Sequence, residues 1–167
     1  MNKKSNHNSK ILIIIAIIVV AAAAVFLNID PKKDTNEAAS NQITKVTDSD
    51  IVIPLANVTE TPSFYPASIN GINLEVIAVK ATDGTVRTAF NTCQVCYSSG
   101  KGYYKVEGDK LVCQNCGNSF GMDDVEVTKG GCNPVPITPE YKTVDDTTIT
   151  ITKDFLNKAT VIFQNWK

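Results

Sequence analysis

The sequence is short of histidine, and its single histidine lies near the start of the chain. His7 precedes a long apolar run, so residues 28–167 contain no imidazole. A Cys/His zinc site and a Rieske-type cluster need imidazole ligands, and Cys–His nucleophilic catalysis needs an imidazole base. The absence of histidine therefore excludes these three kinds of site from the part of the chain that follows the run.

The sequence also lacks an excess of basic side chains. Its 16 Lys and Arg face 17 Asp and Glu, and after residue 27 the counts are 13 and 17, a net charge of −4. Contacts to phosphates need a basic surface, so we expect no nucleic acid partner. The sequence contains no phosphate-binding glycine loop and no serine-hydrolase motif, and it therefore does not support an enzyme with a small-molecule substrate.

One long apolar run is present, and it covers residues 11–27. A helix of this length spans roughly 25 Å, near the lower limit for crossing a bilayer. Lys3, Lys4 and Lys10 precede the run and acidic residues follow it, which places residues 1–10 in the cytoplasm. The sequence predicts a single-pass anchor in the lipid bilayer of the cell membrane and an extracytoplasmic domain. A signal peptide cleaved near the alanines at 21–24 is the alternative.

The remaining chain divides into a tether and a domain. Residues 28–49 are polar without apolar periodicity, which predicts a flexible linker. Residues 50–167 are predicted to form one mainly β domain. The clearest strand is residues 72–80, where apolar side chains alternate on one face. Further strands are expected at residues 51–53, 63–66, 86–90, 147–151 and 160–164, with a short helical turn at residues 153–159.

Two segments of the domain are similar to each other. Residues 51–65 resemble residues 149–163 at a constant offset of 98, and four apolar positions coincide. One interpretation is a pair of strand–turn–strand units that flank the region between them. The alternative is chance similarity between two β-rich segments.

Two Cys-x-x-Cys pairs, Cys93/Cys96 and Cys113/Cys116, are separated by 16 residues. This spacing is typical of a tetrathiolate metal site. Residues 102–112 between the pairs are predicted to form a hairpin that brings the second pair beside the first, as in a zinc ribbon or rubredoxin. Four thiolates suit either zinc or iron, and the spacing does not separate the two metals.

A fifth cysteine, Cys132, lies in the segment Gly-Gly-Cys-Asn-Pro. The two preceding glycines allow a close approach of the backbone. Cys132 could replace one of the four thiolates, help to hold a cluster, or act as a redox-active thiol. A buried free cysteine that packs as a small apolar side chain is the alternative.

Four segments, residues 92–97, 101–103, 111–117 and 130–136, together resemble the membrane iron–sulfur-containing FtrD-like family. The resemblance extends from about residue 50 to the C-terminus. It implies a membrane-attached, extracytoplasmic domain that holds iron or an iron–sulfur cluster. The ligands that it implies are Cys93, Cys96, Cys113, Cys116 and Cys132.

Relatives in this family are associated with iron uptake, so the resemblance implies an electron-transfer or metal-handling accessory of a membrane permease or redox partner. The chain has one predicted membrane segment, whereas larger members have several, and it therefore cannot transport ions alone. Two alternatives remain. One is a structural zinc ribbon that serves as an interaction module of the cell envelope. The other is a thiol–disulfide oxidoreductase, although the usual thioredoxin-like context is missing.

Overall fold

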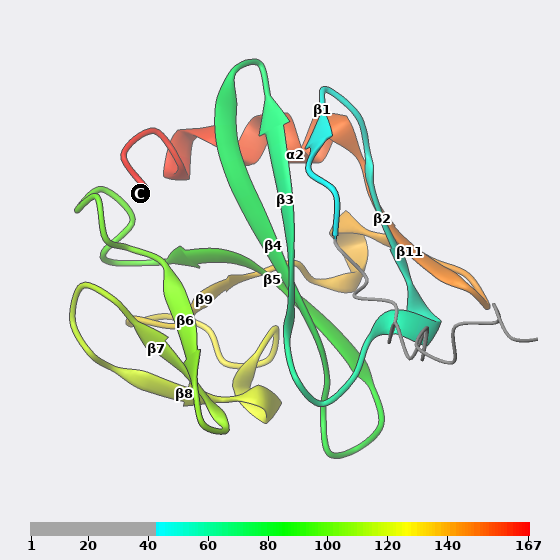
Figure 1. Ribbon diagram of the computed structural model, residues 1–167, viewed down its shortest axis with the longest axis horizontal. Helices are drawn as coiled ribbons and strands as arrows, with labels where there is room; N and C mark the ends of the chain where they lie inside the picture. The colour runs from blue at the N-terminus through cyan, green and yellow to red at the C-terminus, as the bar shows by residue number, and fades with distance from the viewer. Residues whose placement is uncertain (1–42) are drawn as a thin grey trace, which may run out of the picture. The chain divides into compact units, whose positions relative to one another are not determined.

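The fold is built on a five-stranded sheet with the strand order β1-β3-β4-β5-β9 (Figure 1). Its strands are β1 (Val46–Thr47), β3 (Ser63–Ile69), β4 (Ile72–Lys80), β5 (Val86–Cys93) and β9 (Pro134–Pro136). β1 runs parallel to β3, and the other neighbours are antiparallel. The sequence prediction of a mainly β domain is therefore confirmed.

The computed structural model describes residues 43–167, which form one unit. The predicted cytoplasmic segment 1–10, the predicted anchor 11–27 and most of the predicted linker lie outside these residues. None of the helices found within residues 43–167 is long and apolar enough to cross a membrane. β1 lies in the segment that the sequence assigned to the linker, so the chain joins the sheet before residue 50.

Both faces of the central sheet are covered, as the burial of the β4 side chains shows. The residues from Val76 to Val79 are all buried, although strand side chains point alternately to opposite faces. Val76 and Ala78 belong to one core cluster, whereas Ile77 and Val79 belong to a second. A strand buried on one face only would alternate in burial, so the sheet must be the middle layer of the domain.

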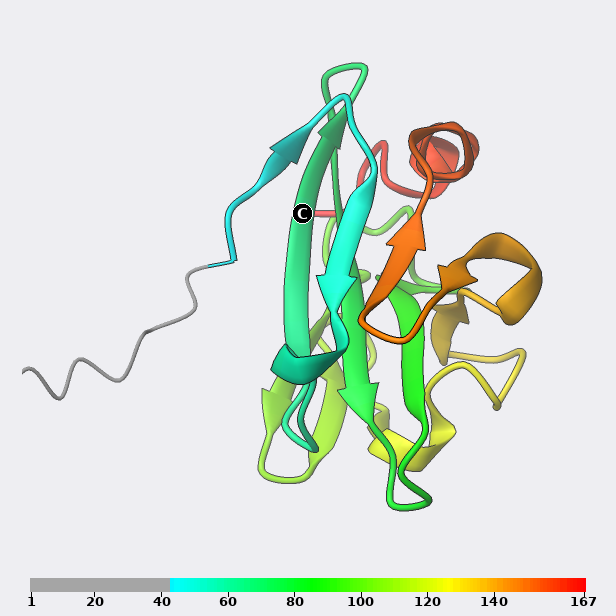
Figure 2. The ribbon, with the colours of Figure 1, turned by 90° about the vertical axis from the view of Figure 1, so that its right-hand side faces the viewer.

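The first core cluster is closed by a second sheet and a helix. The sheet has the order β10-β11-β2, with β10 (Thr143–Val144), β11 (Thr148–Ile151) and β2 (Ile51–Pro54). The helix α2 (Lys153–Ala159) follows β11 directly and lies on the same side of β3 and β4 as β11 (Figure 2). Thr152 caps α2 by accepting a hydrogen bond from the backbone N–H of Phe155, and Leu156 is fully buried.

The second core cluster lies against a third sheet, which has the order β6-β7-β8. β6 (Tyr104–Glu107) and β7 (Lys110–Cys113) form the hairpin that the sequence predicted between the two cysteine pairs, and β8 (Ser119–Gly121) completes the sheet. All three strands lie together at one side of the central sheet in Figure 1. Cys93, Cys96 and Cys113 are buried members of this second cluster.

Short 3-10 helices complete the fold: η1 (Leu55–Asn57), η2 (Met122–Asp124), η3 (Pro139–Tyr141) and η4 (Thr160–Ile162). The structure has the helix η4 where the sequence predicted a strand at residues 160–164, so that prediction was wrong. Phe163 and Trp166 are buried in the first core cluster, and a compact turn after α2 lets both rings pack there.

The internal repeat is not present in the structure. β2 and β11 pair with each other, with Ile51 opposite Ile151 and Ile53 opposite Ile149. The second half of one segment forms strand β3, whereas the second half of the other forms η4. The similarity reflects two strands that pack into the same core, so the interpretation as two equivalent units was wrong.

Candidate metal centre

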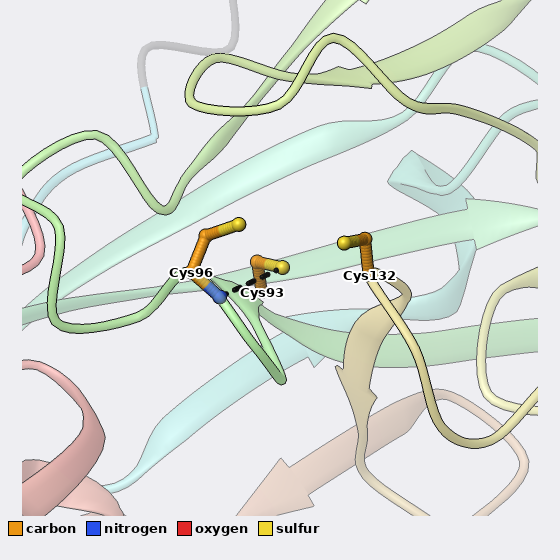
Figure 3. Close-up of side chains that lie close together, drawn as sticks. All are labelled: Cys93, Cys96 and Cys132. Carbon is orange, nitrogen blue, oxygen red and sulfur yellow. Dashed lines mark hydrogen bonds between the residues drawn. The ribbon is translucent and has the colours of Figure 1, made fainter.

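The first cysteine pair lies at the end of β5. Cys93 is the last residue of that strand, and its backbone N–H donates to the carbonyl of Gly102 at 2.7 Å. The chain then turns, so that the backbone N–H of Cys96 donates to the Cys93 sulfur at 3.2 Å (Figure 3). An N–H directed at sulfur stabilises the thiolate form, as expected for a metal-binding turn.

The second pair is arranged in the same way at the end of β7. Cys113 closes that strand, and the N–H of Gly117 donates to its carbonyl at 2.9 Å. Gly117 has a φ of +74°, a left-handed backbone conformation that glycine adopts without strain. The N–H of Gln114 donates to the carbonyl of Tyr103 at 2.9 Å, which ties this turn to the start of β6.

Cys132 reaches the first pair through its loop. Gly130 and Gly131 both have positive φ, at 87° and 61°. The N–H of Gly130 donates to Oε1 of Gln94 at 3.2 Å, and the N–H of Gln94 donates to the carbonyl of Asn133 at 3.2 Å. These bonds hold the loop against the first turn, and Figure 3 shows Cys132 directed toward Cys93 and Cys96.

The five sulfur atoms form two groups that have one member in common. Cys93, Cys96 and Cys132 lie within 4.8 Å of one another, and so do Cys96, Cys113 and Cys116. Around one tetrahedral zinc ion, four sulfurs at about 2.3 Å would lie roughly 3.8 Å apart. Among the residues that the structure describes, the thiols of the two pairs are not found as one such group of four. The ribbon-like hairpin is therefore present, whereas the single tetrathiolate arrangement of a zinc ribbon is not confirmed.

The thiols differ in their access to solvent. Cys93 and Cys113 are fully buried, Cys96 is 8% exposed, Cys132 is half-buried and Cys116 is exposed. All five are free, without a disulfide. The cluster is thus closed on the side of the core and open at Cys116.

The protein environment shifts the pKa values of the thiols in different directions. Burial raises the pKa of the Cys113 thiol to about 12, and contact with the Cys116 thiol, together with burial, raises that of Cys132 to about 12. Burial opposes ionisation of Cys93 as well, but the N–H groups of Cys96 and Val95 outweigh it and lower the pKa of Cys93. Thiols with raised pKa values are protonated near neutral pH, so metal binding must release protons from them.

Tyr104 is the aromatic residue in closest contact with the cluster. Three tyrosines, Tyr97, Tyr103 and Tyr104, lie close to the cysteines in the sequence. Tyr104 is 1% exposed; its hydroxyl donates to the carbonyl of Cys132 and also helps to lower the pKa of Cys93. Tyr97 is 39% exposed, and Tyr103 packs on Trp166 in the other core cluster. Tyr104 is therefore the tyrosine that can fix the position of cysteine ligands.

Removing the hydroxyl of Tyr104 is expected to weaken metal binding. The Tyr104→Phe variant keeps the ring but loses the hydroxyl, which donates to the Cys132 carbonyl and helps to lower the pKa of Cys93. Groups that orient metal ligands typically change affinity by about 10- to 100-fold when they are removed. Competition titration with a chromophoric chelator measures the change. Tyr103→Phe is the matched control, and equal affinities of the two variants would contradict the role assigned to Tyr104.

Two further residues position the cluster and were missed by the sequence analysis. Asn91 is buried in β5; its Oδ1 accepts from the N–H of Tyr104 at 2.8 Å, and its Nδ2 donates to Glu75 at 2.6 Å. Gly102 packs directly against the backbone of Cys96. No sequence signal identifies Asn91, whereas Gly102 lies in the segment 101–103 that carried part of the family resemblance.

The donor set fits a thiophilic metal centre. The described ligand atoms of the cluster are all sulfur, and soft thiolates suit iron–sulfur clusters, iron and zinc. Cys93, Cys96, Cys113, Cys116 and Cys132 would hold such a centre.

Comparison with known families agrees with this donor set. The model of a family described as membrane iron-sulfur containing protein FtrD-like matches residues 57–163, a range that includes all five cysteines. No curated protein and no solved structure matches the chain.

Proposed function

Because the chain belongs to the FtrD-like family of membrane iron–sulfur containing proteins, we propose that its domain binds iron or an iron–sulfur cluster outside the cytoplasm. The proposed role is electron transfer or metal handling as an accessory of a membrane permease or redox partner in iron uptake. The observation that carries the proposal is the gathering of five free thiols from three separate segments into adjoining groups. The apolar run at residues 11–27 supports attachment to the cell membrane through one segment.

The cysteines of the cluster would have different roles at such a site. An iron centre, when bound, supplies a redox couple. The buried Cys93 and Cys113 would hold the centre against the core and keep water away from that side. The exposed Cys116 leaves the opposite side accessible, and a partner can approach there. Burial on one side and access on the other suit exchange with a partner protein.

A structural zinc site is the second candidate function. The β6–β7 hairpin joins two metal-binding turns, as in zinc ribbons, and thiolates bind zinc as readily as iron. In that case the metal would only hold the fold, and the function would reside in a surface contact.

Metal analysis separates these two candidates. The full-length chain, purified without oxygen, is expected to contain iron and to absorb in the visible through charge transfer from thiolate to iron. Cys113→Ser is expected to weaken the absorption, because Cys113 is a fully buried member of the cluster. Ser98→Ala, at an exposed side chain near the first pair, is the control and should keep it. One zinc per chain and no colour would contradict the iron assignment.

A further inference from the structure

Cys96 is the one cysteine that belongs to both thiol groups. Cys93 and Cys132 complete the first group, and Cys113 and Cys116 complete the second. Cys96 lies in the turn after β5, and its thiol contacts those of Cys93 and Cys116. The two Cys-x-x-Cys pairs are therefore not equivalent, although the sequence spacing within them is the same.

In the part of the chain that the structure describes, the four thiols of the two pairs are not found together in either group. One tetrahedral ion held by the two pairs would need its four sulfurs to be mutual neighbours. The grouping instead offers three thiols to each of two positions, and the two positions meet at Cys96.

We propose that the cluster provides two adjacent metal-binding positions and that Cys96 is a ligand to both. This inference rests on the proposed function, in that it requires the thiols to bind metal. Two separate tetrahedral sites would need eight donors, whereas five cysteines with one shared thiolate give each position three. A thiolate sulfur has enough lone pairs to bind two metal ions at once. The fourth ligand at each position would come from outside the five cysteines.

The shared position of Cys96 also gives Cys132 a role. Cys132 is the third donor of the first position, so that position cannot form from Cys93 and Cys96 alone. A centre held by the two pairs alone would leave Cys132 without a function, yet two hydrogen bonds and two positive-φ glycines bring its loop to Cys93 and Cys96. The loop geometry is accounted for when Cys132 is a ligand.

Cobalt titration of the full-length chain tests the inference. Co²⁺ reports thiolate ligation through charge-transfer bands, and the reduced, metal-free chain is expected to bind two Co²⁺ ions. Cys132→Ser and Cys113→Ser should each bind one ion, because each removes a ligand of one position. Cys93→Ser should also bind one ion, whereas Cys96→Ser should bind neither with wild-type affinity. The last two variants are a matched pair from the same turn, and circular dichroism verifies that both fold.

A second measurement needs no variant. Two Co²⁺ ions that share a thiolate are magnetically coupled, so the electron paramagnetic resonance signal is expected to rise with the first ion and to fall with the second. One Co²⁺ per chain with unchanged affinity in Cys132→Ser, or equal losses in Cys93→Ser and Cys96→Ser, would overturn the inference and leave metal binding intact. A wild-type chain that binds no metal would instead overturn the proposed function, and the shared ligand with it.

Discussion

Replacing Gly102 by alanine is expected to weaken metal binding by at least about 100-fold without altering any cysteine. A Cβ atom at this position would lie 2.3 Å from the carbonyl oxygen of Cys96, 2.6 Å from its carbonyl carbon and 2.8 Å from the Cα of Tyr97. These are backbone atoms of the first metal-binding turn, and no side chain can rotate to make room. The turn itself must move, and Cys96 moves with it.

The displacement would affect both thiol groups, because Cys96 belongs to each of them. It would also disturb the bond from the Cys93 N–H to the Gly102 carbonyl. Overpacking of a well-packed site costs about 1–3 kcal/mol of stability. We expect metal affinity to fall by at least about 100-fold, the upper end of what the loss of a supporting contact produces.

Cobalt titration and urea unfolding measure the two effects of Gly102→Ala. Gly121→Ala is the matched control in β8, since its added Cβ would meet only side-chain atoms, a carboxylate oxygen of Asp124 at 3.3 Å and Nζ of Lys110 at 3.8 Å. The control should bind metal nearly as the wild type does. Wild-type affinity in Gly102→Ala would show that the turn tolerates the displacement and would contradict the close packing described for it.

Replacing Lys142 by methionine is expected to cost about 3–5 kcal/mol of stability, as is typical when one partner of a buried ion pair is removed. Nζ of Lys142 lies 2.5 Å from Oε2 of Glu126, and the two side chains are only 4% and 13% exposed. The same carboxylate oxygen accepts from the N–H of Thr88 at 2.8 Å. Without Lys142, the carboxylate would remain buried beside β5 without its cation.

The ion pair matters for the site because of where it lies in the chain. Glu126 precedes the loop that carries Cys132, Lys142 follows β9, and Thr88 belongs to β5, which ends at Cys93. The cluster of Glu126, Lys142 and Thr88 therefore holds the Cys132 segment against the strand that carries the first pair. Loss of the ion pair should loosen Cys132 as well as destabilise the fold.

Urea unfolding of three variants distinguishes the effect of losing the buried ion pair from a general effect of removing a lysine. Lys153→Met removes an exposed pair in which Nζ lies 3.9 Å from Asp48, and its effect should stay within about 0.5 kcal/mol. The double variant Lys142→Met with Glu126→Gln should be more stable than Lys142→Met alone, since it leaves no buried charge while glutamine can still accept from Thr88. A double variant as unstable as the single one would contradict a buried, unpaired carboxylate as the cause.

Several elements could be predicted from local sequence because their signals are local. β4 has the bounds that its apolar alternation predicted, and α2 has the bounds predicted for the helical turn, with Thr152 as its cap. The hairpin between the cysteine pairs was also predicted. Only its role as the cover of a second core cluster required the tertiary structure.

The errors have a common physical cause. β-branched residues at 160–162 favour a strand, but burial of Phe163 and Trp166 requires a compact turn there. The similarity of residues 51–65 and 149–163 was interpreted as a repeat, yet it arises because β2 and β11 pair and face the same core. Local patterns do not specify which distant segment will become a partner.

The sequence by itself determined the chemistry of this protein: five cysteines without histidine in residues 28–167, in a spacing and context that placed the chain in its family. Tertiary structure alone decided how the sulfurs are grouped, with Cys96 common to two sets and Cys132 brought to Cys93 across 39 residues. It also decided that Gly102 and Tyr104 support the cluster. The reason is that ligand type is a property of single residues, whereas ligand grouping depends on how three sheets pack around two core clusters.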